Sequence, residues 1–119
     1  MSNNLSYTFS AGGEHNGQFL FQAVLYQRGR PVAEYNLWLS TITPVLTTKV
    51  DSFERGKGFA SEIIKRTIPE RLEQIAAEYG SFTHQEEFTP LGERLRPLIL
   101  SLGYVERNGK LVRDYPSKI

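Results

Sequence analysis

The sequence predicts one α/β (α+β) domain in which a mixed, mostly antiparallel sheet of about six strands carries two main helices. Three observations predict this class. Short apolar segments separated by turns fill residues 5–50, a long helical pattern follows from residue 59, and a second helical pattern leads to a hairpin signal. Nothing in the composition marks a boundary, so residues 1–119 are expected to form a single domain.

Four strand segments precede the first helix. They cover residues 5–10, 19–27, 32–42 and 45–50. Segment 19–27 is apolar on both faces, which is typical of a central strand. Residues 11–17 and 28–31 are rich in turn formers and are expected to be the connections.

The first helix is predicted from the spacing of its apolar residues. These are Ala60, Ile63, Ile64, Ile68, Leu72, Ile75, Ala76 and Tyr79. Pro69 interrupts the pattern, because proline has no backbone N–H and its ring clashes with the preceding turn. We therefore expect a kink or a break there, with Thr67 as the N-cap of a restarted helix and Glu70 reaching back to it.

A second helix is predicted to begin at Thr89 and Pro90, to bend at Pro97 and to stop at Gly103. Its apolar face would contain Leu91, Leu95, Leu98, Ile99 and Leu102.

The remaining segments complete the sheet. Residues 80–85 are short and polar, but a strand is expected there because the topology requires one between the two helices. Asn108 and Gly109 give the strongest short hairpin signal and predict that strands 104–107 and 110–115 pair.

The loop before the first helix carries the most distinctive motif, Arg55, Gly56, Lys57, Gly58, Phe59 and Ala60. Where a helix begins, its first backbone N–H groups lack an intrahelical partner and the helix dipole is positive. The two glycines let an anion approach closely, and two basic side chains add positive charge. The loop therefore predicts a phosphate-bearing ligand, although its spacing fits neither a Walker A loop nor the dinucleotide fingerprint.

The positions of Arg55, Gly58 and Ala60 resemble the pyrophosphate-binding loop of the GNAT family of N-acetyltransferases, Arg/Gln-x-x-Gly-x-Gly/Ala. Val50 stands five residues earlier, like the hydrophobic end of that family's fourth strand. Residues 102–104 are similar to the Leu-Gly-Phe step that follows its last helix. A helix start that carries glycines for chain geometry alone is the simpler alternative.

This resemblance implies a GNAT-like acyl-CoA transferase fold and N-acetyltransferase activity with acetyl-CoA as co-substrate. The residues expected to bind acetyl-CoA are Val50, Arg55, Gly56, Lys57, Gly58, Phe59 and Ala60. The acceptor would be an amine in a small molecule, a peptide or a protein. Direct attack of that amine on the thioester, without a covalent enzyme intermediate, agrees with the absence of cysteine.

The sequence also departs from the family's pattern. Residues 11–17 leave no room for the two helices that normally lie between the first and second strands. Ile99 occupies the position of the usual tyrosine acid, and the usual glutamate base would fall near Thr47 or Thr48. Three interpretations stay open: a large acceptor docks on an open groove, a second copy or another protein completes the site, or transfer chemistry has been lost.

Acetyl transfer needs a base that takes a proton from the acceptor nitrogen, directly or through water. The candidates are His84 and Glu86, at the end of the predicted strand beside the cofactor cleft, and Glu34 on the long strand. Histidine has a suitable unperturbed pKa near 6.5. The alternatives are a solvated or structural histidine and two ordinary surface carboxylates.

Composition narrows the other classes of function. A net charge of +1 makes a nucleic-acid partner an unfavoured choice, and the aromatic residues Phe19, Phe21, Tyr35 and Trp38 are expected in the core rather than on a base-stacking platform. No apolar run has membrane-spanning length and no signal region is visible, so a cytoplasmic protein without a membrane partner is expected. The alternative to an enzyme is a non-catalytic GNAT-like protein that binds CoA, a protein partner, or both, the partner through an open sheet face.

Overall fold

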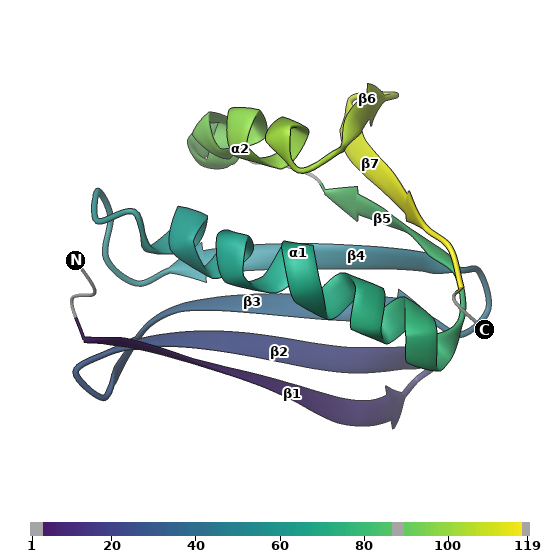
Figure 1. Ribbon diagram of the computed structural model, residues 1–119, viewed down its shortest axis with the longest axis horizontal. Coiled ribbons are helices and arrows are strands. Elements are labelled where there is room, and N and C mark those ends of the chain that lie inside the picture. The colour runs from purple at the N-terminus through teal and green to yellow at the C-terminus, as the bar shows by residue number, and fades with distance from the viewer. Residues whose placement is uncertain (1–3, 87–89, 118–119) are drawn as a thin grey trace.

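Seven strands form one sheet in the computed structural model, which describes residues 4–86 and 90–117. The sheet order is β1-β2-β3-β4-β5-β7-β6, and the helices lie on one face of it (Figure 1). The strands are β1 Leu5–His15, β2 Gln18–Gln27, β3 Arg30–Ser40, β4 Val45–Ser52, β5 Phe82–Glu86, β6 Val105–Arg107 and β7 Lys110–Tyr115. The helices are α1 Phe59–Tyr79, the 3₁₀ helix η1 Pro90–Leu95 and α2 Arg96–Ser101. The predicted fold class is confirmed.

One pair of neighbouring strands is parallel and the other pairs are antiparallel. Strand β4 pairs with β5 only from Val45 to Thr47, and α1 makes the crossover between them. Beyond Thr47 the two strands diverge, as Figure 1 shows, while β4 continues to Ser52 beside β3. The strand that topology required is therefore present, and it ends at Glu86 rather than at residue 85.

The connection between β1 and β2 is shorter than predicted. Strand β1 runs to His15 with a bulge between Ala11 and Gly13, and only Asn16 and Gly17 form the turn, both with positive φ (51° and 79°). A two-residue turn of this kind matches the right-handed twist of paired strands. The expected turn over residues 11–17 was wrong in length, and the expected absence of helices between these strands is confirmed.

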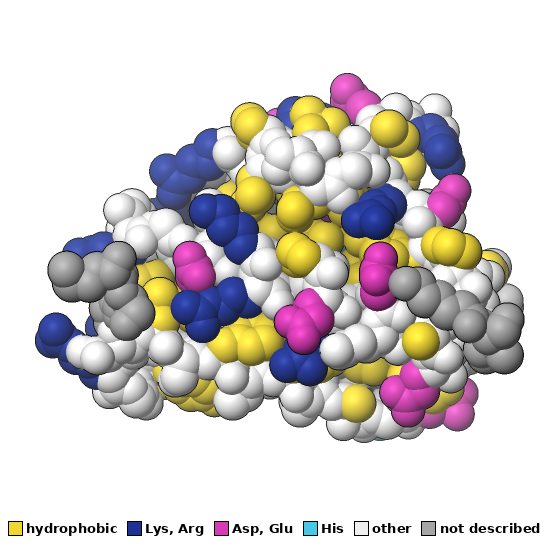
Figure 2. Space-filling view, viewed as in Figure 1, with side chains coloured by type: hydrophobic (Ala, Val, Ile, Leu, Met, Phe, Trp, Pro, Cys, Tyr) yellow, Lys and Arg dark blue, Asp and Glu magenta, His cyan; other side chains and the backbone are white. Residues whose placement is uncertain are grey.

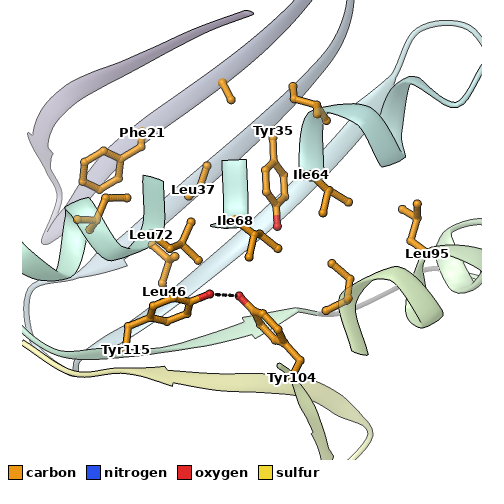
Figure 3. Packing of buried hydrophobic residues seen from close by; sticks show 14 of the residues in the cluster. Phe21, Tyr35, Leu37, Leu46, Ile64, Ile68, Leu72, Leu95, Tyr104 and Tyr115 are labelled. Atoms are coloured by element: carbon orange, nitrogen blue, oxygen red, sulfur yellow. Dashed lines mark hydrogen bonds between the residues drawn. The ribbon is translucent and has the colours of Figure 1, made fainter. Parts of the chain in front are cut away.

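Helix α1 packs across β2, β3 and β4 and buries its apolar face against them (Figure 3). Its fully buried side chains include Ile63, Ile64, Ile68 and Leu72. Burial of a side chain of this size contributes roughly 1.5–3 kcal/mol. This packing positions the amino end of α1 beside the free half of β4.

Of the kink or break predicted at Pro69, the break is wrong, because α1 is one helix from Phe59 to Tyr79. Pro69 lies on the exposed face, while Ile68 beside it is fully buried in the core. Apolar burial on both sides of the proline keeps the helix continuous. Thr67 is not an N-cap, since its Oγ1 donates to the carbonyl of Ile63 at 2.7 Å.

The second predicted helix is divided in two. Pro97 lies in the first turn of α2, where a proline is tolerated, and the preceding turn is the 3₁₀ helix η1. Leu95 and Ile99 are buried, whereas Leu98 and Leu102 are half-buried. The predicted start at Thr89 and the side chain of Leu91 lie outside the described residues.

The opposite face of the sheet has no described helix on it. Trp38 is half-buried on this face, so its prediction as a core residue was wrong, whereas Phe21 and Tyr35 are in the core. Strand β2 is accordingly buried on one side only, through Phe21, Ala23 and Leu25. This leaves a broad sheet surface uncovered in the described part of the chain.

Candidate functional site

The loop between β4 and α1 has the conformation that an anion cradle needs. Gly56 and Gly58 have φ of 74° and 76°, a region that glycine adopts without strain. A Cβ added at either position would meet no atom within 4 Å, so both glycines face open space. The first helical backbone bond runs from the N–H of Glu62 to the carbonyl of Gly58 at 3.0 Å. The preceding N–H groups of α1 therefore lie ahead of the hydrogen-bonded part of the helix.

A cavity of about 470 Å³ opens beside this loop. It is lined by Val50, Asp51, Ser52, Glu54, Arg55, Gly56, Gly58, Phe59, Ala60, Ser61, Gly92, Arg94 and Leu95. The predicted acetyl-CoA residues thus line one cavity, with the exception of Lys57, which is exposed on the same loop. The structure adds Arg94 of η1, an exposed side chain that lines the same cavity.

Figure 2, in the view of Figure 1, shows Lys and Arg side chains along the end of the molecule where the loop and η1 lie. Apolar side chains gather in the depression between α1 and α2. Arg55 and Arg94 thus face the cavity together with the carboxylates of Asp51 and Glu54, the latter paired with Arg30 at 2.7 Å, while the depression between the helices is apolar. Basic side chains beside an apolar depression suit a ligand with a charged end and an uncharged arm.

A buried polar cluster lies where β4 and β5 stop pairing. Glu86, at the end of β5, accepts a hydrogen bond from the hydroxyl of Tyr35 and one from Thr48 Oγ1, the latter at 2.5 Å. Thr48 Oγ1 also lies 2.9 Å from His84 Nε2, and His84 Nε2 lies 3.6 Å from Glu86 Oε1. Glu86 is 2% exposed and His84 is fully buried.

The cluster continues away from Glu86 through two tyrosines. His84 Nδ1 lies 2.5 Å from the hydroxyl of Tyr104, which lies 2.8 Å from the hydroxyl of Tyr115. Figure 3 shows these two tyrosines meeting beneath α1. Both ring nitrogens of His84 are therefore engaged by neighbouring hydroxyls.

Burial shifts the pKa values of Glu86 and His84 in opposite directions. It raises the pKa of Glu86 to about 7, against the opposing hydrogen bonds from Thr48 and Tyr35. It lowers the pKa of His84 to about 3, so the imidazole is neutral at physiological pH. The expectation of an ordinary histidine pKa near 6.5 is thus corrected by the site, and the group that titrates near neutrality is Glu86.

The structure brings His84 and Glu86 together and leaves Glu34 apart. Glu34 precedes Tyr35 on β3 and therefore points to the opposite face of the sheet. It is half-buried there, 3.5 Å from the amide of Gln22 and 3.4 Å from that of Asn36. Glu34 faces the uncovered sheet surface and not the cavity.

Sequence interpretation missed four members of the cluster: Tyr35, Thr48, Tyr104 and Tyr115. Alternation along β5 places Phe82, His84 and Glu86 on one face, a signal that was available. The contribution of Thr48 depends on the register between β4 and β5, which no local pattern gives. Ile99, at the position expected for a tyrosine acid, is fully buried in the core.

Solved structures superpose on this chain over most of its length. The ribosomal-protein-S18-alanine N-acetyltransferase of Escherichia coli matches with a TM-score of 0.59 and 14% identity, covering 96% of each chain. The GNAT domain of S. lividans PAT matches with a TM-score of 0.56 and 16% identity. The chain has the GNAT fold. The match with the PAT domain covers 85% of this chain and 64% of that one.

Escherichia coli ElaA matches at the same level, with a TM-score of 0.56 and 14% identity over 87% of this chain and 72% of its own. No protein-family model and no curated protein sequence matches the chain. At these sequence identities the comparison with GNAT structures shows the fold alone. In the described residues, no helix has the length and apolarity needed to cross a bilayer.

Proposed function

We propose that the protein is an acyl-CoA-dependent N-acyltransferase that takes acetyl-CoA as co-substrate and acetylates an amine. The observation that carries this proposal is spatial continuity within a GNAT fold. The cavity at the start of α1 is lined by Val50 on the free half of β4, and Thr48 lies two residues earlier on the same face, bonded to Glu86. The loop proposed to bind the pyrophosphate and the carboxyl group of Glu86, with its pKa near 7, thus both lie beside β4.

The residues at the loop fit a pyrophosphate. Gly56 and Gly58 leave open the space that a Cβ would fill, and the unpaired N–H groups at the start of α1 favour negative charge. Arg55 and Arg94 approach the same cavity from the loop and from η1. Acetyl-CoA, bound here, would supply an acyl group activated as a thioester.

The proton transfers then assign roles to this chain's own side chains. When an amine attacks the thioester, a C–N bond forms, the C–S bond breaks, one proton leaves nitrogen and one reaches sulfur. Glu86 is the proposed base, since its carboxylate is available above pH 7. His84 has no free ring nitrogen, so it acts through Thr48. Ile99 has no proton to give, and we assign protonation of sulfur to water.

The acceptor side is open, because β1 and β2 are joined by a two-residue turn. This favours a bulky acceptor, such as a peptide or a protein, over a small amine that would need enclosing walls.

A non-catalytic CoA-binding or partner-binding protein is the second candidate, favoured by the near-complete burial of Glu86 and by the uncovered sheet face. Two measurements on the same sample separate the candidates. Calorimetry with acetyl-CoA reports binding, and mass spectrometry of amines, peptides and aminoglycosides after incubation with acetyl-CoA reports transfer. Binding with acetylated product supports the enzyme; binding without product on any acceptor supports the second candidate; no binding excludes the acetyl-CoA assignment.

A further inference from the structure

The buried cluster has one self-consistent set of proton positions when Glu86 is ionised. Thr48 has a single hydroxyl proton and gives it to Glu86 Oε2 at 2.5 Å. The oxygen of Thr48 can then only accept from His84 Nε2, 2.9 Å away. That nitrogen must therefore carry the proton of the neutral imidazole.

The same logic fixes the far side of the ring. With Nε2 protonated, Nδ1 of His84 is an acceptor, and the hydroxyl of Tyr104 at 2.5 Å is its donor. The oxygen of Tyr104 in turn accepts from Tyr115 at 2.8 Å. Tyr115, Tyr104, His84 and Thr48 therefore form a row of hydrogen bonds in which each group donates to the next, toward Glu86.

The opposite tautomer would undo this order. With the proton on Nδ1, the bare Nε2 would draw the hydroxyl proton of Thr48, and Glu86 Oε2 would lose its donor. A carboxylate that loses a donor is less stable in its charged form. The tautomer of His84 is thus linked to the ionisation of Glu86 through one rotatable hydroxyl.

Few other groups face this row. From β3, Tyr35 donates to the other oxygen of Glu86. From β7, Arg113 donates to the carbonyl of Leu102 at 2.9 Å and lies over the ring of Tyr115. From α1, the carboxylate of Glu73 acts on Tyr115 at the far end of the cluster. The buried side chains that complete the surroundings are apolar, among them Ile64 and Ile68 of α1 (Figure 3) and Ile99 of α2.

We propose that Tyr104 is a positioning residue, which holds His84 in its Nε2–H tautomer and thereby keeps the Thr48 hydroxyl directed at Glu86. It touches no reacting atom. Its effect on catalysis rests on the proposed function, in which Glu86 is the base, whereas its effect on His84 and Glu86 is a property of the protein without ligand.

The test uses nuclear magnetic resonance on the unliganded protein. Nitrogen-15 shifts of His84 report the tautomer, and a carbon-13 titration of the Glu86 carboxyl reports its pKa. In Tyr104→Phe we expect a gain of the Nδ1–H tautomer and a rise in the Glu86 pKa of about one unit, a tenfold change in the ionisation constant. Tyr7→Phe is the matched control, because it removes a hydroxyl bonded to Thr67 at 2.8 Å outside this row; neither readout should move.

Thr48→Val breaks the link itself. It should raise the Glu86 pKa, and adding Tyr104→Phe to it should cause no further rise. Tyr115→Phe, one step farther along, serves if Tyr104→Phe does not fold, and should give a smaller shift in the same direction. An unchanged His84 tautomer and Glu86 pKa in a folded Tyr104→Phe variant would overturn the proposal. So would a rise in the Glu86 pKa that Tyr104→Phe causes equally in the wild type and in Thr48→Val. If the wild-type protein transfers no acyl group but these shifts occur, the proposed function fails and the positioning role stands.

Discussion

Thr48 on β4 and Glu86 on β5 are joined by a 2.5 Å hydrogen bond just beyond the last paired residues of the two strands. The two strands diverge from this point, and the cavity beside the 55–60 loop lies along the free part of β4. The bond therefore ties the buried polar cluster to the strand that lines the proposed acetyl-CoA site. The predictions below test the two ends of that connection.

Acetyl-CoA or CoA should raise the melting temperature. A ligand at about 100 times its dissociation constant adds about 2.7 kcal/mol to the free energy of unfolding. ATP and NAD also carry phosphates but should stabilise the protein less than CoA does. Neither has an uncharged arm like that of CoA to fill the apolar depression between the helices. Differential scanning fluorimetry measures the shifts. No shift with millimolar CoA in a folded sample contradicts the cofactor assignment.

Gly58→Val should abolish CoA binding, since the side chain would enter the open space in front of the helix start. The positive φ of 76° also adds backbone strain, about 1–3 kcal/mol. Gly29→Val is the matched control: Gly29 has a φ of 79°, its added Cβ also meets nothing within 4 Å, and it lies in the β2–β3 turn. Calorimetry should show binding by the control alone. Normal binding by Gly58→Val would mean that the glycine serves chain geometry only.

Arg55→Ala and Arg94→Ala should each weaken CoA binding by less than Gly58→Val, because exposed cations contribute only part of a site built from backbone N–H groups. Their effect should shrink as salt rises. Lys65→Ala, an exposed change on α1 away from the cavity lining, should leave the affinity unchanged. Equal losses in all three variants would indicate bulk charge rather than a site.

The stability of the fold should depend on pH through two opposing groups. The raised pKa of Glu86 favours the folded state below pH 4.5, and that contribution is lost as pH rises to about 7. The lowered pKa of His84 works in the other direction: its contribution is present above pH 6.5 and is lost as pH falls to about 3. Urea unfolding of Glu86→Gln should therefore show stability that rises with pH between about 4.5 and 6.5 more steeply than in the wild type. An identical slope in the two proteins contradicts the shifted Glu86 pKa.

The fold was largely predictable because its signals are local. Helical spacing gave the span of α1, and Asn108 with Gly109 gave the last hairpin. The same turn signal stands at Asn16 and Gly17, but the glycines just before it also favour a turn, and β1 is therefore longer than predicted. Pro69 was given too much weight, since apolar burial along α1 outweighs one missing backbone bond.

The candidate site was predictable in part. Its anion loop is a contiguous motif, and His84 and Glu86 share a strand face. Thr48 enters the cluster through strand register, and Tyr104 and Tyr115 enter it through tertiary packing, neither of which is written in local sequence. Glu86 rather than His84 titrates near neutrality because both side chains are buried, and that burial exists only in the assembled core.

Glu34→Gln is the matched comparison for any change at Glu86. Both residues are glutamates on strands, but Glu34 lies on the uncovered sheet face beside the side-chain amides of Gln22 and Asn36. Acetyl transfer by Glu34→Gln should equal that of the wild type. A large loss in this variant, measured as acetylated product, would move the base to the other face of the sheet.

The pH–rate profile of acetyl transfer by the wild type and by Glu86→Gln tests the central claim most directly. The wild-type rate should rise with pH to a plateau with a midpoint near 7, because the carboxylate is the active form. Glu86→Gln should bind acetyl-CoA as tightly and transfer about 10²-fold or more slowly, the range expected for loss of a general base. Equal rates in the two proteins, or tight binding of acetyl-CoA by a wild type that acetylates no amine, would contradict the account.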